Sequence, residues 1–177
     1  MTISLYDVSI ASYLQIVPAV NAVMNKAAEH FTAQGTDLDQ LLETRLYPDM
    51  LPLRFQLLSV VHHSVHVIDA IRGGVFGPGS YDATLGFAAV QQKLETAAKD
   101  LAALGVDEVN ELSGRPMAFV MGELNLPFSA ENFVLSFSLP NLHFHAATAY
   151  DIFRQQGLPL GKRDFLGRLR ITRQAKG

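Results

Sequence analysis

Four segments of this chain place apolar side chains at the three-to-four-residue spacing of an α-helix, and this pattern restricts the possible folds most strongly. The segments cover residues 5–31, 49–72, 80–101 and 129–157, and stretches rich in glycine or proline lie between several of them. Each segment would form a helix with one apolar face that a partner must cover. We therefore predict an all-α fold, a four-helix bundle, because that arrangement buries four such faces in one core.

Local capping signals predict where the helices begin. Thr36, with Asp39 three residues later, is expected to open a short helix ahead of the second segment. Asp49 and Ser80 are expected to cap the second and third long helices. Pro18 interrupts the first segment and predicts a kink there.

The periodicity changes between the third and fourth segments. Residues 115–128, "RPMAFVMGELNLPF", read as two short strands that turn near Gly122, which predicts a small β-hairpin between the third and fourth helices. Ser129, with Glu131 in the first turn, is then expected to open the fourth helix.

Bulk composition narrows the classes of function. A chain of 177 residues is most simply one domain, residues 1–177, and the absence of cysteine excludes disulfides and thiolate ligands. A net charge of −3 gives no general attraction to nucleic acid or to an anionic membrane. The first residues lack the basic start of a signal peptide, and no apolar run approaches the length of a membrane span. We therefore expect a cytoplasmic protein.

The last part of the chain, residues 157–177, is predicted to be a C-terminal extension that packs on the bundle. Its acidic residue is Asp164, and its only aromatic residue is Phe165. Its six basic residues are Lys162, Arg163, Arg168, Arg170, Arg173 and Lys176. Because nucleic-acid binding would require more aromatic side chains among the charges, the pattern favours a tail lying across an acidic surface.

The second segment contains a histidine cluster, "HHSVH". At 100° per residue His62, His66 and Asp69 fall in one sector of a helix, a spacing that could hold a divalent metal such as Zn or Ni, while His63 points elsewhere. The apolar face lies opposite, and its members are Leu53, Leu57, Val60, Val67 and Ile71. The cluster is therefore expected to point away from the core, toward solvent or another subunit.

The fourth segment has the reverse arrangement. His145 shares a face with its apolar residues and should point inward, whereas His143 should be exposed. Asn141 and Thr148 lie on the same side as His145, and Pro140 frees one backbone carbonyl. Such a group could be a ligand site, or its members could simply satisfy one another and the freed carbonyl.

Two stretches resemble a known family. Residues 140–167, "PNLHFHAATAYDIFRQQGLPLGKRDFLG", and residues 42–50, "LETRLYPDM", are similar to its recognisable motifs, as is the opening "SLYDVSI". The family is domain-of-unknown-function family nineteen-ninety-three, grouped with the DinB/YfiT-like superfamily. The resemblance implies a four-helix bundle that is often a homodimer.

The wider superfamily implies a metal site as well. Its members hold a divalent metal with one histidine from the second helix and two from the fourth at positions i and i+4, and some catalyse thiol-dependent transfer or hydrolysis. This chain departs from that pattern, because its fourth-segment histidines, His143 and His145, are two residues apart and Ala149 stands four residues after His145.

Three functional hypotheses follow. The first is a homodimeric bundle with no metal cofactor that binds a small molecule in a polar pocket formed by Asn141, His145 and Thr148, with Arg45 and Asp49 completing it. His145 would act there as proton donor or acceptor.

The second hypothesis is a metal-dependent hydrolase or transferase that uses His62, His66 and Asp69. The third is a scaffold whose apolar second-helix flank dimerises. That flank consists of Leu51, Phe55, Leu58 and Val65.

Overall fold

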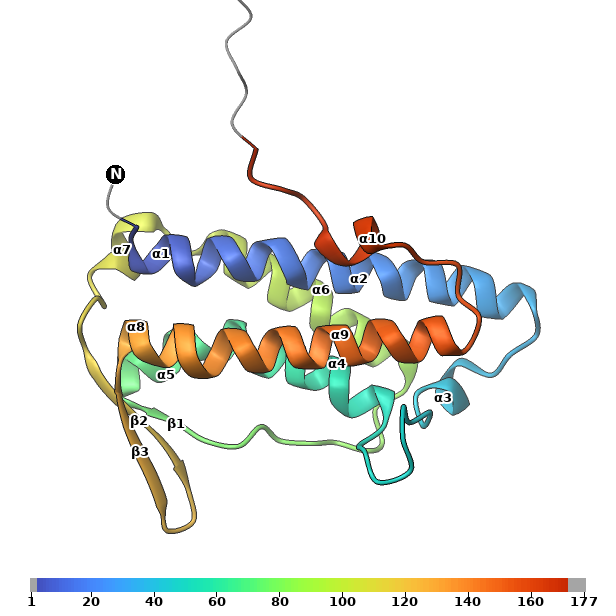
Figure 1. The fold of residues 1–177 in the computed structure, drawn as a ribbon, viewed down its shortest axis with the longest axis horizontal. Coiled ribbons are helices and arrows are strands. Elements are labelled where there is room, and N and C mark those ends of the chain that lie inside the picture. Colours follow the sequence, from blue (N-terminus) through green and yellow to red (C-terminus); the bar gives the residue numbers. More distant parts are fainter. Residues whose placement is uncertain (1–2, 172–177) are drawn as a thin grey trace, which may run out of the picture.

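The computed structural model describes residues 3–171 and has a mostly helical fold with a small three-stranded sheet (Figure 1). The long helical elements are α2 (Ile10–Ala33), α4 (Leu53–His62), α5 (Val65–Gly73), α6 (Phe87–Ala103) and α9 (Leu139–Gln155). Helix α9 is preceded without a gap by α8 (Ala130–Phe133) and the π-helix η1 (Val134–Ser138). The shorter helices are α1 (Leu5–Val8), α3 (Leu38–Leu41), α7 (Val106–Asn110) and α10 (Lys162–Leu166).

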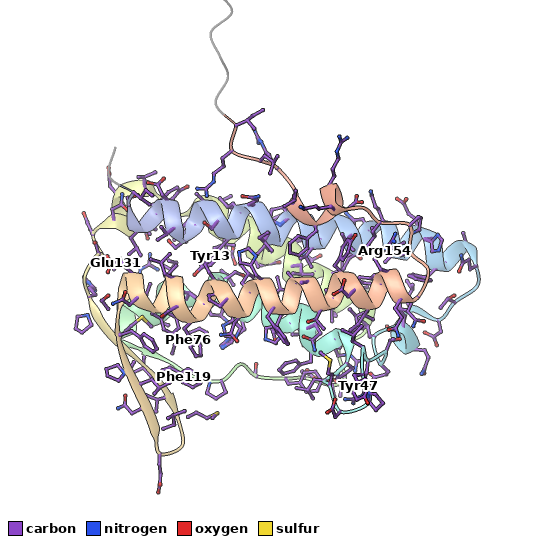
Figure 2. All side chains as sticks on the ribbon, in the orientation of Figure 1. Tyr13, Tyr47, Phe76, Phe119, Glu131 and Arg154 are labelled. Carbon is purple, nitrogen blue, oxygen red and sulfur yellow. The ribbon has the colours of Figure 1, made fainter. Side chains whose placement is uncertain are left out.

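The core lies between the long helices. Helix α2 packs against α6 and α9, and α4 packs against the same two helices. Tyr13 of α2 is fully buried and points toward the helical segment that contains η1 (Figure 2). The five residues assigned to the apolar face of the second segment are all buried, at 1% exposure or less. Each such side chain stabilises the fold by about 1.5–3 kcal/mol relative to an exposed position.

The hairpin is confirmed, but the all-α prediction is incomplete. Strands β2 (Pro116–Met121) and β3 (Leu124–Ser129) pair antiparallel, and Gly122 adopts a φ of 58° at the turn. The two-residue strand β1 (Val75–Phe76) pairs in parallel with β2 and completes the sheet. Two residues are too few to show a strand periodicity, so this element had no signal in the sequence.

The second predicted helix is in fact two helices. Helix α4 ends at His62 and α5 begins at Val65. Ser64 between them donates its hydroxyl to the carbonyl of Val60, the kind of local bond that competes with a helical ladder. At the start of α4, Pro52 occupies the N-cap position that was predicted for Asp49. The first segment is also interrupted, at Ser9, while α2 continues through Pro18.

Two other predicted caps were wrong. The N-cap of α3 is Asp37 and not Thr36. The third long helix begins at Phe87, well after Ser80, and its first backbone N–H donates to Asp39 Oδ1 at 2.7 Å. The chain between β1 and α6, residues 77–86, therefore contains no helix; we call it the strap. By contrast, the predicted cap Ser129 accepts a hydrogen bond from the N–H of Asn132.

Contrary to the expectation from the sequence, the helical stretch Leu5–Ala33 is long and apolar enough to cross a membrane, by length and composition alone. Its 18-residue test window has a mean hydropathy of 1.2, and 50% of that window is buried inside the protein. The buried half is the face that packs against the other helices in the core.

Residues 158–170 lie against the first half of the chain. Lys26 of α2 forms an ion pair with Asp164, at 2.5 Å, and Gln15 donates its side-chain amide to the carbonyl of Leu166. Arg170 donates to the backbone carbonyl of Asp7. The last two basic residues considered above, Arg173 and Lys176, lie outside the described residues.

Gly167 is the point of closest approach between this segment and α2. Its φ is 59°, and a Cβ there would lie 2.6 Å from the backbone oxygen of Gln15 and 2.9 Å from the Cβ of Ala19. Gly167→Ala is therefore expected to lower the free energy of unfolding by about 2 kcal/mol, because backbone strain and a clash with helix backbone add together.

Gly35→Ala is the matched control in urea unfolding. Gly35 has a similar φ of 72°, but a Cβ there meets nothing within 4 Å. It should cost about 1 kcal/mol, the conformational term alone. If both variants lose the same free energy of unfolding, the close approach of Gly167 to α2 does not add to the cost of the substitution.

Candidate ligand-binding site between helices α4 and α9

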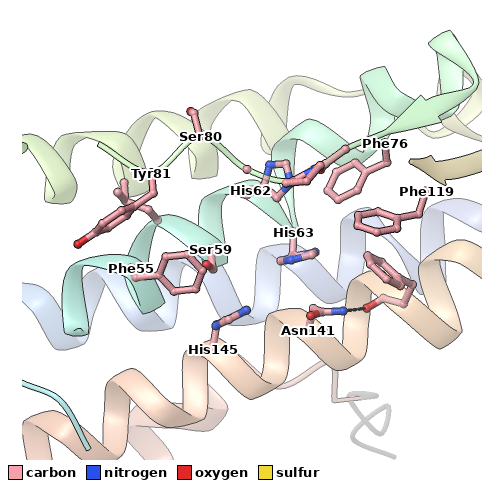
Figure 3. Close-up of a pocket in the computed structure, with 15 residues that line it drawn as sticks. Phe55, Ser59, His62, His63, Phe76, Ser80, Tyr81, Phe119, Asn141 and His145 are labelled. Carbon is pink, nitrogen blue, oxygen red and sulfur yellow. Dashed lines mark hydrogen bonds between the residues drawn. The ribbon is translucent and has the colours of Figure 1, made fainter. Parts of the chain in front are cut away.

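A cavity of about 290 Å³ lies between α4 and α9 and beneath the strap (Figure 3). Three imidazoles face it, from His62 and His63 on α4 and from His145 on α9. The aromatic residues of its wall are Phe55, Phe76, Tyr81, Phe119 and Phe137. Its other polar side chains are Ser59, Ser80 and Asn141.

His145 is buried, as its helical face predicts, while His143 is exposed. The Nδ1 atom of His145 lies 2.8 Å from Gln56 Oε1 on α4. Because a carboxamide oxygen only accepts, Nδ1 carries the proton and Nε2 keeps its lone pair. Burial, with a smaller contribution from the nearby His62, lowers the pKa of His145 to about 4. The ring is therefore neutral at physiological pH.

His63 also faces this cavity, a position that the sequence pattern did not predict. It is the C-cap of α4, where the helix ends, and its ring stacks on that of His145 with centroids 5.7 Å apart and planes at 14°. Its Nδ1 is buried and has no hydrogen-bond partner. Burial, together with His62 and His145, lowers the pKa of His63 to about 3.

His62 closes the side of the cavity next to the strap. It donates its Nε2–H to the carbonyl of Gly77 at 2.9 Å, and its ring stacks on Phe76 with centroids 4.4 Å apart. Burial lowers its pKa as well. The strap passes directly over the ring, because a Cβ added to Gly79 would lie 2.9 Å from His62 Cγ. His62 is therefore half-buried and not on an outward surface.

The predicted metal ligands His62, His66 and Asp69 do not meet at one point. His66 lies beside His62, with their Nδ1 atoms 3.3 Å apart, and faces a neighbouring cavity. Asp69 is instead bonded by Arg72, which also pairs with Glu108. Over residues 3–171, no three His, Cys, Asp or Glu side chains converge to hold an ion. The fourth-helix pair of the site that the superfamily implies is missing from this chain, because Ala149 stands four residues after His145.

The other candidate residues lie in different places. Asn141 lines the cavity and donates to the carbonyl of Phe137 at 2.7 Å. Thr148 is buried and bonds the carbonyl of Phe144, and it does not line the cavity. Arg45 and Asp49 are exposed in the loop before α4, and Arg45 bonds the carbonyl of Met50. The structure therefore brings together Asn141 and His145, but not Arg45, Asp49 or Thr148.

Sequence reasoning missed most of the aromatic wall. Phe55 had been assigned to a flank for dimerisation, together with Leu58, but both residues line the cavity. Phe76, Phe119 and Phe137 come from β1, β2 and η1 and carry no shared spacing. The one usable signal was Pro140, because the π-helix that turns Phe137 toward the cavity ends just before it.

The site is uncharged at neutral pH. Of the residues described by the structure, no Asp, Glu, Lys or Arg lines the cavity, and the three imidazoles have lowered pKa values. Asp82 and Lys93 line the neighbouring cavity on the far side of His62. The arrangement can accept hydrogen bonds in an apolar setting, where they are stronger than in water.

The fold resembles that of the DinB family. The crystal structure of a DinB family member protein from Shewanella denitrificans superposes with a TM-score of 0.80, covering 96% of each chain at 22% sequence identity. The family model described as "Domain of unknown function (DUF1993)" matches residues 5–166. The chain belongs to this family. No curated protein matches the sequence.

Proposed function

We propose that this protein is a four-helix bundle of the DinB type that binds a small molecule in the cavity between α4 and α9. The observation that carries the proposal is the His145 ring, which is only 9% exposed and held by Gln56, with its remaining nitrogen available to a ligand. A buried imidazole in a fixed tautomer is a preorganised hydrogen-bond acceptor.

The neighbouring His63 supports the same proposal. Its ring lines the same cavity and stacks on that of His145, so a ligand there would meet a second neutral imidazole. The cavity is near the lower limit of the range typical of small-molecule sites, about 300–1,000 Å³. Its wall also has the typical composition, mostly aromatic with a few polar groups.

A small-molecule screen by thermal shift tests the proposal. A ligand present at one hundred times its Kd should stabilise the protein by about 2.7 kcal/mol. This corresponds to a rise in Tm of about 5–10 °C. His145→Phe keeps a ring but removes both nitrogens, and it should clearly reduce the shift while the protein stays folded.

His143→Phe is the control, because it makes the same chemical change at an exposed position two residues away. It should leave the shift intact. A shift produced by Zn or Ni and abolished by replacing His62 and His66 would instead favour the metal-dependent alternative. Compounds whose thermal shift is the same in the wild type and in His145→Phe would contradict the proposed site.

A further inference from the structure

We propose, resting on the function above, that the ligand class of this cavity is an uncharged aromatic molecule that donates a hydrogen bond from a ring hydroxyl, the chemistry of a phenol. Three properties of the cavity lead to this class: the shape and composition of its wall, the absence of charge, and the direction of its available hydrogen bonds.

The wall favours a flat ring. At one end of the cavity the ring centroids of Phe119 and Phe137 lie 4.7 Å apart. At the other end Phe55 and Tyr81 meet edge to face, with ring centroids 5.5 Å apart. Figure 3 shows His63 and His145 between Phe119 and the pair formed by Phe55 and Tyr81. An aromatic ligand can stack on one ring and present its edge to another, the arrangements that aromatic pairs prefer. A flexible aliphatic chain would lose more entropy on ordering.

The absence of charge disfavours an ionised ligand. No Asp, Glu, Lys or Arg in the described part of the chain lines the cavity, so either a carboxylate or an ammonium would be buried without a counter-ion. The aromatic faces could offset part of that cost for a cation, but not for an anion. A neutral ligand avoids it.

The best-defined free polar atom of the cavity is an acceptor. His145 has its Nδ1–H engaged by Gln56, so only Nε2, an acceptor, remains. The Nε2–H of His62 is engaged by Gly77. Asn141 has one amide hydrogen committed to the carbonyl of Phe137, and its Oδ1 and second amide hydrogen remain free. The hydroxyls of Ser59, Ser80 and Tyr81 also line the cavity and can either donate or accept. A ligand hydroxyl suits this set because it can donate to His145 Nε2, which a ligand carbonyl or ether cannot do.

A matched set of probes tests this class by titration calorimetry at pH 7. The probes are para-cresol, its methyl ether, toluene, para-toluate and para-methylbenzylammonium. We expect para-cresol to bind about five to ten times more tightly than its methyl ether or toluene, which lack the donor, and more tightly than either ion.

The variants identify the acceptor. His145→Phe should remove the preference for para-cresol over its methyl ether, and His143→Phe should preserve it. Equal affinity for the two neutral oxygen compounds, tighter binding of either ion, or no binding of any probe would overturn the proposed class. An ion whose binding depends on His145 would overturn the class while supporting the ligand site. Failure of the probes together with an empty screen would overturn both.

Discussion

Acidification from pH 7 to pH 5 is expected to lower the free energy of unfolding by about 2–3 kcal/mol, because the imidazoles of His63 and His145 resist protonation in the native state. Burial lowers the pKa of His145 to about 4 and that of His63 to about 3, whereas an unfolded histidine titrates near 6.5. Below pH 6.5 these two histidines therefore bind protons in the unfolded chain but not in the native state. The stability is complete above pH 6.5 and is lost as the pH falls toward 4.

One unit of pKa shift is worth about 1.4 kcal/mol. The expected loss is smaller than the sum of the two converted shifts, because the two rings are neighbours whose titrations are coupled and neither ring is fully enclosed. Urea unfolding at pH 7, 6 and 5 measures it. Either His145→Phe or His63→Phe should make the pH dependence shallower, and His143→Phe should retain most of it. The same pH dependence in all four proteins would show that the two rings are not protected from protons.

Ser138→Ala is expected to destabilise the protein by about 2–3 kcal/mol, because it leaves the buried phenol of Tyr13 and the backbone carbonyl of His63 without a partner. Ser138 in η1 donates its hydroxyl to the carbonyl of His63 at 2.8 Å and accepts from the hydroxyl of Tyr13 at 2.7 Å. Both Tyr13 and Ser138 are fully buried, and burial raises the pKa of Tyr13. These bonds connect α2, η1 and the break after α4.

A double-mutant cycle with Tyr13→Phe separates the two bonds. The double variant should be less destabilised than the sum of the single variants, because removing both hydroxyls leaves no unpaired phenol. Ser136→Ala, an exposed position in the same π-helix, should cost about 0.5 kcal/mol or less. If Ser138→Ala costs no more than this control, the Tyr13–Ser138–His63 bonds do not hold the break in place.

Ser138→Ala also tests how His63 is positioned. The break places the ring of His63 against His145, so loosening it should disturb the imidazole NMR resonances of both residues. The resonances of His30, on the far end of α2, should not change.

Predictions from local pattern were the most successful. The apolar stripes of α4 and α9, the hairpin turn at Gly122 and the Ser129 cap were all correct, because each depends on residues a few positions apart. The predicted start of the third helix at Ser80 failed for the opposite reason. The residue that bonds the first N–H of α6 is Asp39, which lies 48 positions earlier in the chain.

The predicted orientation of His62 was wrong because of the break between α4 and α5 and the strap. Treating residues 49–72 as a continuous helix turned His62 outward and gave no reason to place His63 beside His145. The strap covers His62, and His63 is the C-cap at the break after α4, so both rings face the cavity.

By itself, the sequence determined the apolar faces of the core helices, the hairpin turn at Gly122 and the inward position of His145, because side-chain periodicity and adjacent turn residues act over short stretches of chain. Only the tertiary structure decided that His62, His63 and His145 face one aromatic cavity and that Arg72 of α5 pairs with Glu108 of α7. The physical reason is that these contacts join parts of the chain far apart in sequence, whose meeting depends on how the helices break and pack.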